Sequence, residues 1–165
     1  MKNKKLRILF LLIPALLLLW YQWHSRPQTL ETLFPDFPWD NFQGISGSYL
    51  EYVPRRDTPG MLTTENASVS LVPDDDPSAR ELISLLRAQP FKTIAGSPAT
   101  YIPVQEGDFI AELCFEQGAD FIQLRYRVNE VTIRQGDTEY FCDFTGHEET
   151  AKAVFTWLKA HAAAK

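Results

Sequence analysis

Residues 108–128, DFIAELCFEQGADFIQLRYRV, hold the pattern that decides the fold. Apolar and polar side chains alternate on both sides of Gln117-Gly118-Ala119, a period of two that is typical of β-strands with one buried face. The segment therefore predicts two antiparallel strands, 108–116 and 121–128, joined by a short turn. The apolar sets are Phe109, Ala111, Leu113 and Phe115 in the first strand and Ile122, Leu124, Tyr126 and Val128 in the second, while Gln123, Arg125 and Arg127 line the other face.

Neighbouring segments extend this pair into a sheet. Residues 131–134 and 139–144 flank a tight turn and continue an antiparallel meander that has one solvated face. Four further strands are expected before the meander. Their predicted ranges are 45–53, 67–72, 91–94 and 99–104.

Two helices are predicted to cover the apolar face of this sheet. Asp76 suits the N-cap of the first helix, and Pro77 suits its first helical position. The second helix is expected to begin with a capping box, in which Thr145 caps and Glu148 reaches back. Residues at helical spacing then form its apolar stripe: Ala151, Val154, Phe155, Leu158 and Ala162. The body, residues 44–162, is thus predicted to be one α+β domain, an antiparallel β-meander packed by two helices.

An apolar run, residues 6–23 with the sequence LRILFLLIPALLLLWYQW, precedes the body. It suits either a cleaved signal peptide or an uncleaved signal anchor. Bulky Trp23 stands where cleavage after Ser25 would need a small residue, and about 18 helical residues span roughly 27 Å. We therefore predict a single transmembrane anchor behind a basic cytoplasmic tip, residues 1–5. The anchor residues are Leu6, Ile8, Leu9, Phe10, Leu11, Leu12, Ile13, Leu16, Leu17, Leu18, Leu19 and Trp20.

The charges divide the chain at the same place. Residues 1–26 hold five of the 16 basic residues and none of the 21 acidic ones, which leaves residues 27–165 with 11 basic and 21 acidic residues, a net charge of −10. Positive charge on the short amino-terminal side predicts that the body is exported, so we expect a cell-membrane protein with an extracytoplasmic domain. An acidic body without a basic cluster argues against nucleic-acid binding.

The spacer between anchor and body, residues 24–43, combines three prolines with four aromatic residues. The prolines favour turns and extended backbone, although residues 29–33 suit one helical turn. The aromatic residues indicate either a docking motif for a partner or a cluster that packs the spacer onto the domain, and we favour packing. These candidate partner-surface residues are Phe34, Phe37, Trp39 and Phe42.

No motif in the chain predicts catalysis, a cofactor or a metal. His147-Glu148-Glu149 begins like a zinc-binding HExxH helix, but Ala151 stands where the second histidine belongs. Gly44-Ile45-Ser46-Gly47-Ser48 misses the last glycine of a hydrolase nucleophile elbow and leads into a strand. The acids 74–76 lack the spacing of a calcium loop, and helix-terminus electrostatics explains them more simply.

The two cysteines, Cys114 and Cys142, are predicted to be free thiols on opposite sheet faces. Strand alternation places Cys114 on the face of Glu112 and Glu116, and a bridge requires Cα atoms within about 7 Å with convergent side chains.

Arg125 and Arg127, with Arg134, are expected on the solvated sheet face. Pairing with strand acids such as Glu112 is the simpler interpretation, and an anion or partner surface is the alternative.

Four segments carry a family resemblance: KNKKLRILFLLIPALLLLW (2–20), PSARELISLLRAQPFKTI (77–94), FIAELCFEQGADFIQLRYRV (109–128) and TEYFCDF (138–144). In pattern, over residues 60–145, the layout resembles the small, uncharacterised membrane-anchored or lipoprotein-type extracytoplasmic domains of Gram-positive gut bacteria. That resemblance implies no known activity and no catalytic residue.

These features predict a membrane-tethered, extracytoplasmic, non-enzymatic module that binds a protein or an envelope component. An extracytoplasmic hydrolase with dispersed residues and an accessory subunit of a membrane complex are the alternatives. A pocket of clustered titratable groups would favour the enzyme, whereas an exposed patch or sheet edge would favour binding. The oligomeric state and the ligand stay open.

Overall fold

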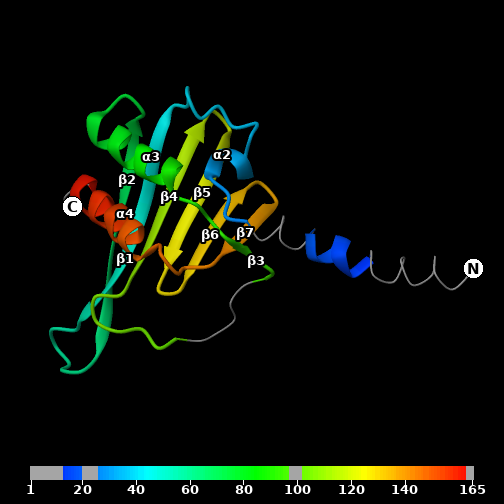
Figure 1. Cartoon of the computed structure of the whole chain (residues 1–165). Helices are drawn as coiled ribbons and strands as arrows, with labels where there is room; N and C mark the ends of the chain where they lie inside the picture. The colour runs from blue at the N-terminus through cyan, green and yellow to red at the C-terminus, as the bar shows by residue number, and fades with distance from the viewer. Residues whose placement is uncertain (1–12, 20–25, 97–101, 163–165) are drawn as a thin grey trace, which may run out of the picture.

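A computed structural model describes residues 13–19, 26–96 and 102–162 of the chain. Seven antiparallel strands form one sheet, in the order β2-β1-β4-β5-β6-β7-β3, and the helices lie against it (Figure 1). The strands are β1 (Gly44–Pro54), β2 (Leu62–Pro73), β3 (Thr93–Ile94), β4 (Phe109–Gln117), β5 (Asp120–Arg127), β6 (Glu130–Gln135) and β7 (Thr138–Cys142). The helices are α2 (Leu30–Leu33), α3 (Pro77–Ala88) and α4 (Glu148–His161).

The predicted alternation sets the register of the central strands. Leu113 of β4 lies opposite Leu124 of β5, which lies opposite Ile133 of β6, and all three side chains are fully buried. Residues opposite one another in an antiparallel pair share a face, so these positions define the helix face of the sheet. The other face, on which Glu112 lies opposite Arg125, is called the open face below.

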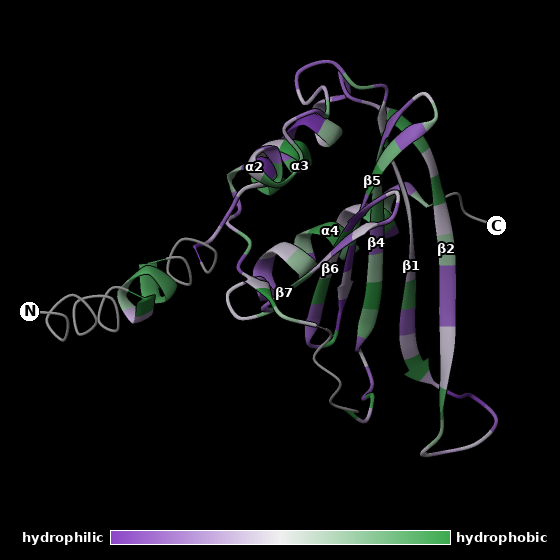
Figure 2. Ribbon diagram, turned by 90° about the vertical axis from the view of Figure 1, so that its right-hand side faces the viewer, coloured by the Kyte–Doolittle hydropathy of each residue, from purple (hydrophilic) through white to green (hydrophobic). Residues whose placement is uncertain are grey.

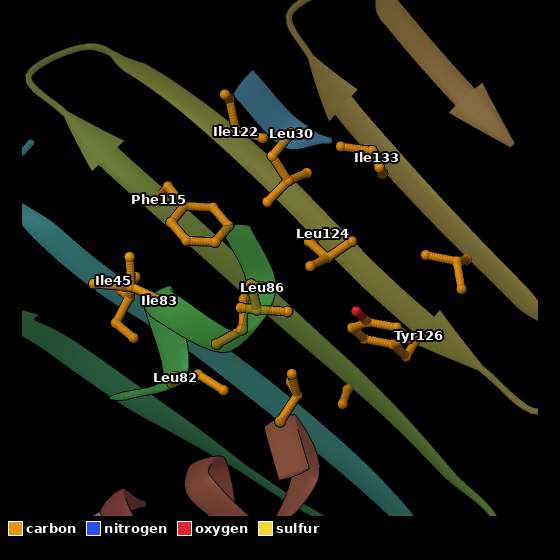
Figure 3. Packing of buried hydrophobic residues seen from close by; sticks show 14 of the residues in the cluster. Leu30, Ile45, Leu82, Ile83, Leu86, Phe115, Ile122, Leu124, Tyr126 and Ile133 are labelled. Atoms are coloured by element: carbon orange, nitrogen blue, oxygen red, sulfur yellow. The ribbon is translucent and has the colours of Figure 1, made fainter. Parts of the chain in front are cut away.

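Helix α3 begins as its sequence predicts. The Asp76 side chain accepts hydrogen bonds from the backbone N–H groups of Ser78 and Ala79, and Pro77 occupies the first turn. Leu82, Ile83 and Leu86 then recur at helical spacing and lie over the strands that carry the apolar core (Figure 3). Their burial against the helix face holds the helix on the sheet.

The spacer is part of the core. Phe34, Phe37, Trp39 and Phe42 are each at most 7% exposed, so the packing interpretation holds and these four side chains offer no docking surface. Their rings contact sheet residues, since Trp39 and Phe42 both stand edge-on against Phe115.

The part of the predicted fold class that needs correction is the transmembrane helix before the domain. Within the expected anchor, residues 13–19 are helical and the exposed side chains include Ile13, Leu16, Leu17, Leu18 and Leu19. Among the described residues no helix is long and apolar enough to cross a membrane. The fold-class prediction of a transmembrane helix before the domain is therefore wrong. The other anchor residues, Leu6, Ile8, Leu9, Phe10, Leu11, Leu12 and Trp20, lie outside the described residues.

Three further expectations differ from the structure. The domain is packed by α2 as well as by α3 and α4, because the spacer folds onto it. Helix α4 has no capping box: it begins at Glu148, and its N-cap His147 makes no side-chain capping bond. Residues 102–104 of the expected strand 99–104 form no strand, and residues 99–101 lie outside the described residues.

Candidate functional site

The helices leave one face of the sheet, the open face, uncovered. Helices α2, α3 and α4 lie on the other side of the strands (Figure 2). On the open face the strands present side chains that are only partly buried, such as Ser48, Glu112 and Arg125. A solvated sheet face normally carries mixed polar groups of this kind.

A shallow depression of about 400 Å³ lies on this face, where β2, β1, β4 and β5 run side by side. Its walls combine hydroxyl, amide and guanidinium groups with two aliphatic side chains, Leu50 and Ile110. The lining residues are Ser48, Tyr49, Leu50, Asn66, Ala67, Ser68, Ile110, Glu112, Arg125 and Arg127.

The carboxylate of the depression is already neutralised. Arg125 forms an ion pair with Glu112, with 2.5 Å between Nη2 and Oε2, and its Nε–H donates to the same oxygen at 2.6 Å. Gln123 Nε2 donates to the other oxygen, Glu112 Oε1, at 2.7 Å. The predicted cross-strand pair is thus confirmed, and it leaves no carboxylate oxygen free of a partner.

Arg127 differs from Arg125. Its side chain is exposed, and within the part of the chain that the structure describes it has neither an ion pair nor a hydrogen bond. Glu130 lies opposite Arg127 in the register, but its carboxylate accepts a hydrogen bond from Thr132 Oγ1 at 2.9 Å instead. The depression therefore carries a guanidinium that has no ion pair or hydrogen bond within the described residues, and neutral donors lie beside it.

The cysteines do not offer a nucleophile. Cys114, on the open face, has its thiol pKa raised to about 11 by burial and by the nearby Glu112 and Glu116. Cys142, on the helix face, has its pKa raised to about 12 by burial. Both are free, which confirms the predicted thiols on opposite faces, and both stay protonated at neutral pH.

A second hollow, an apolar groove of about 750 Å³, runs between α3 and α4 on the outside of the helical layer. Leu82, Leu85 and Trp157 contribute to its lining, and Ser78 and His161 stand at one end. Ser78 Oγ lies 3.0 Å from His161 Nε2, which resembles the nucleophile and base of a hydrolase.

The hydrogen bonds around Ser78 favour a structural role. The Ser78 hydroxyl donates to Asp76 Oδ1 at 2.6 Å, a nearer and charged acceptor. The same Asp76 oxygen accepts from the backbone N–H groups of Ser78 and Ala79, so these donors are not free to stabilise an oxyanion. The bonds to Ser78 also lower the pKa of Asp76. We conclude that the cluster caps α3 and joins it to α4.

Arg87 lines two further hollows, one between α3 and the spacer and one between α2 and the spacer. Arg87 of α3 donates to Glu31 at 2.6 Å, to Asp40 at 2.9 Å and to the carbonyl oxygen of Trp39 at 3.2 Å. These bonds raise the pKa of Arg87, against a lowering by its burial. Because the three partners all lie in the spacer or in α2, Arg87 fixes that segment to α3.

The structure brings together two of the residues that the sequence singled out, Arg125 and Arg127, and adds neighbours from distant strands. Ser48 of β1 lies opposite Ser68 of β2 and opposite Glu112 of β4. The alternating hydroxyl and amide residues in 46–48 and 64–68 were the available signal, but they become a lining only when these strands pair with β4. No protein-family model, no curated protein and no solved structure matches this chain.

Proposed function

We propose that the chain is a non-enzymatic binding module that recognises a carboxylate group of a partner peptide or protein in the depression around Arg127. The observation that carries this proposal is the Arg127 guanidinium, which has no ion pair or hydrogen bond within the described residues and lies beside neutral donors on the uncovered face of the sheet. A guanidinium binds a carboxylate through two parallel hydrogen bonds, which gives both affinity and orientation.

The neighbouring residues suit the rest of such a ligand. Asn66, Ser48 and Ser68 supply donors and acceptors, and Leu50 and Ile110 supply apolar contact. Small pockets commonly combine apolar walls with a few placed polar groups. An extended peptide with one acidic side chain would use both kinds of contact.

The charges favour a carboxylate over a phosphate. The depression offers one guanidinium, that of Arg127, without an ion pair in the described part of the chain, and residues 27–165 carry a net charge of −10. A dianionic phosphate would meet stronger repulsion from this field than a monoanionic carboxylate. The single positive charge of one guanidinium balances the single negative charge of one carboxylate.

An extracytoplasmic location belongs to the proposal too. Its support is the amino-terminal segment, in which basic residues and no acidic residue flank the apolar run 6–23, a composition typical of an export signal. Protease added to intact cells should degrade the domain, whereas protection of the domain would place it inside.

The binding test uses the full-length chain and a defined probe. Titration with the peptide acetyl-Gly-Glu-Gly-amide, followed by amide chemical shifts in NMR spectra, should shift signals of the strands around the depression. The analogue acetyl-Gly-Gln-Gly-amide should bind at least about tenfold more weakly, because a charge-assisted hydrogen bond contributes about 1.5–3 kcal/mol.

Two variants test the residue assignment. Arg127→Gln should weaken binding of the Glu peptide by about tenfold or more. Arg134→Gln on β6 should not weaken binding, because Arg134 lies outside the depression and donates to the carbonyl oxygen of Gly136. Equal binding of the Glu and Gln peptides, or an unaffected Arg127→Gln variant, would overturn the proposal.

A further inference from the structure

The two margins of the sheet differ greatly in length. At one margin β3 has two residues, whereas at the other β2 has twelve, from Leu62 to Pro73. Among the described residues β2 pairs only with β1, so its outer backbone groups have no strand partner (Figure 1). A long free edge of this kind is a template for pairing with another strand.

The usual protections of an edge strand are weak here. Proteins block such edges with lysines, prolines, bulges or short strands. β2 contains no lysine and one charged residue, Glu65, and its only proline is its last residue. The bulge in the β1–β2 pairing falls near the end of β2, between the partners of Ile45 and Gly47, so residues 62–69 pair regularly with β1.

We propose that the partner of this edge is β2 of a second copy of the chain, paired antiparallel about a two-fold axis with Asn66 opposite Asn66. The chemistry of the edge is self-complementary. The exposed side chains Thr64, Asn66 and Ser68 both donate and accept hydrogen bonds, and two amides can satisfy each other. An edge for an unlike partner would need no such symmetry.

The register between the two β2 strands follows from the sheet face on which each side chain lies and from the charge of Glu65. A two-fold axis perpendicular to the sheet keeps the helices of both copies on one side, and then only residues of the same face lie opposite each other. The register centred on Glu65 would oppose two carboxylates, which is unfavourable. The register centred on Ala67 would pair residues of the bulge. The register centred on Asn66 avoids both and pairs residues 63–69 with 69–63.

The dimer through β2 does not depend on a carboxylate ligand in the depression. It predicts one continuous sheet through two chains and places the two depressions near the axis, because Asn66 and Ser68 line each of them. A partner with two acidic groups could then contact both copies.

Sedimentation equilibrium of the full-length chain tests the assembly. Wild type should be dimeric, and Asn66→Lys should weaken the dimer at least about tenfold, because it opposes two like charges at the axis. The matched control Ser84→Lys, on an exposed position of α3, should stay dimeric. A monomer at every accessible concentration, or a dimer that Asn66→Lys leaves unchanged, would overturn the proposal.

A cross-link checks the register without relying on a disruptive variant. In a Cys114→Ser background, Asn66→Cys should form an intermolecular disulfide on mild oxidation, since opposite Cα atoms in an antiparallel pair lie about 4.5–5.5 Å apart. Ser48→Cys, one strand further from the edge, should not. Failure of Asn66→Cys to cross-link faster than Ser48→Cys would refute the register.

Discussion

The indole ring of Trp39 stands edge-on against the phenyl ring of Phe115, with 5.5 Å between the ring centroids and 69° between the planes. The indole Nε1–H also donates to the carbonyl oxygen of Phe34 at 2.9 Å. Trp39 therefore satisfies its one polar group within the spacer while its ring packs on β4. The contact makes the spacer a structural part of the domain.

Trp39→Ala should destabilise the domain by about 3–5 kcal/mol, because it removes a buried aromatic ring and leaves a cavity. Chemical denaturation of the full-length chain measures the change in the free energy of unfolding. Asp36→Ala, at an exposed spacer position, is the matched control and should stay within about 0.5 kcal/mol of wild type. A wild-type stability for Trp39→Ala would mean that the spacer does not contribute to the core.

Gly47→Ala should destabilise the domain by roughly 1–3 kcal/mol or more, through overpacking. A Cβ atom at Gly47 would lie 2.3 Å from the carbonyl oxygen of Glu112 and 2.7 Å from Leu158 Cδ2, so β1, β4 or α4 would have to shift. Thermal unfolding compares this variant with Ser70→Ala on the exposed part of β2, for which little change is expected. If both variants unfold at the same temperature, α4 does not approach β1 as closely as described.

Leu158→Ala, Phe155→Ala and Lys152→Ala should destabilise the domain in that decreasing order. Leu158 is fully buried, so Leu158→Ala should lower the free energy of unfolding by about 2–5 kcal/mol. Phe155 stacks on Phe109 at 4.4 Å but stays partly exposed, so its loss should cost less than a fully buried phenylalanine. Lys152 is exposed, so Lys152→Ala should change the free energy of unfolding little. A lower denaturation midpoint for Phe155→Ala than for Leu158→Ala would contradict this ranking.

Stability should fall as the pH is lowered from about 7.5 to 5.5. His147 is 2% exposed, its ring stacks on Phe91 with 4.9 Å between the centroids, and its Nδ1 has no hydrogen-bond partner among the residues that the structure describes. Burial lowers the pKa of His147 below the ordinary 6.5. The unfolded chain then binds more protons between the two pKa values, so the free energy of unfolding rises with pH by at most about 1.4 kcal/mol per pH unit.

The control for this pH effect is a variant that keeps an aromatic ring stacked on Phe91. His147→Phe preserves an aromatic ring against Phe91 and removes the titration, so its stability should change less between these pH values. A wild-type pH slope in His147→Phe would assign the effect to other groups.

Much of the fold could be predicted because the relevant signals are local. Alternation in 108–128 predicted the paired strands β4 and β5, and Asp76-Pro77 predicted where α3 begins. Local signals also misled. Thr145 and Glu148 fit a capping box, but α4 begins later, because the backbone N–H of Thr145 bonds instead to Asp143 Oδ1 at 3.1 Å. The apolar run 6–23 fitted a membrane span, whereas no described helix is long and apolar enough to be one.

The sequence by itself determined where the strands alternate, which helix ends are capped by acids, and how charge divides the chain. Only the tertiary structure decided that β1 inserts between β2 and β4, since strand order depends on pairings between residues far apart in the chain. That pairing gathers Ser48, Asn66 and Arg127 into one depression and places β2 at the margin of the sheet, where among the described residues it pairs only with β1. It also pairs Arg125 with Glu112 and leaves Arg127 without an ion pair among the described residues, because cross-strand register determines which charges meet.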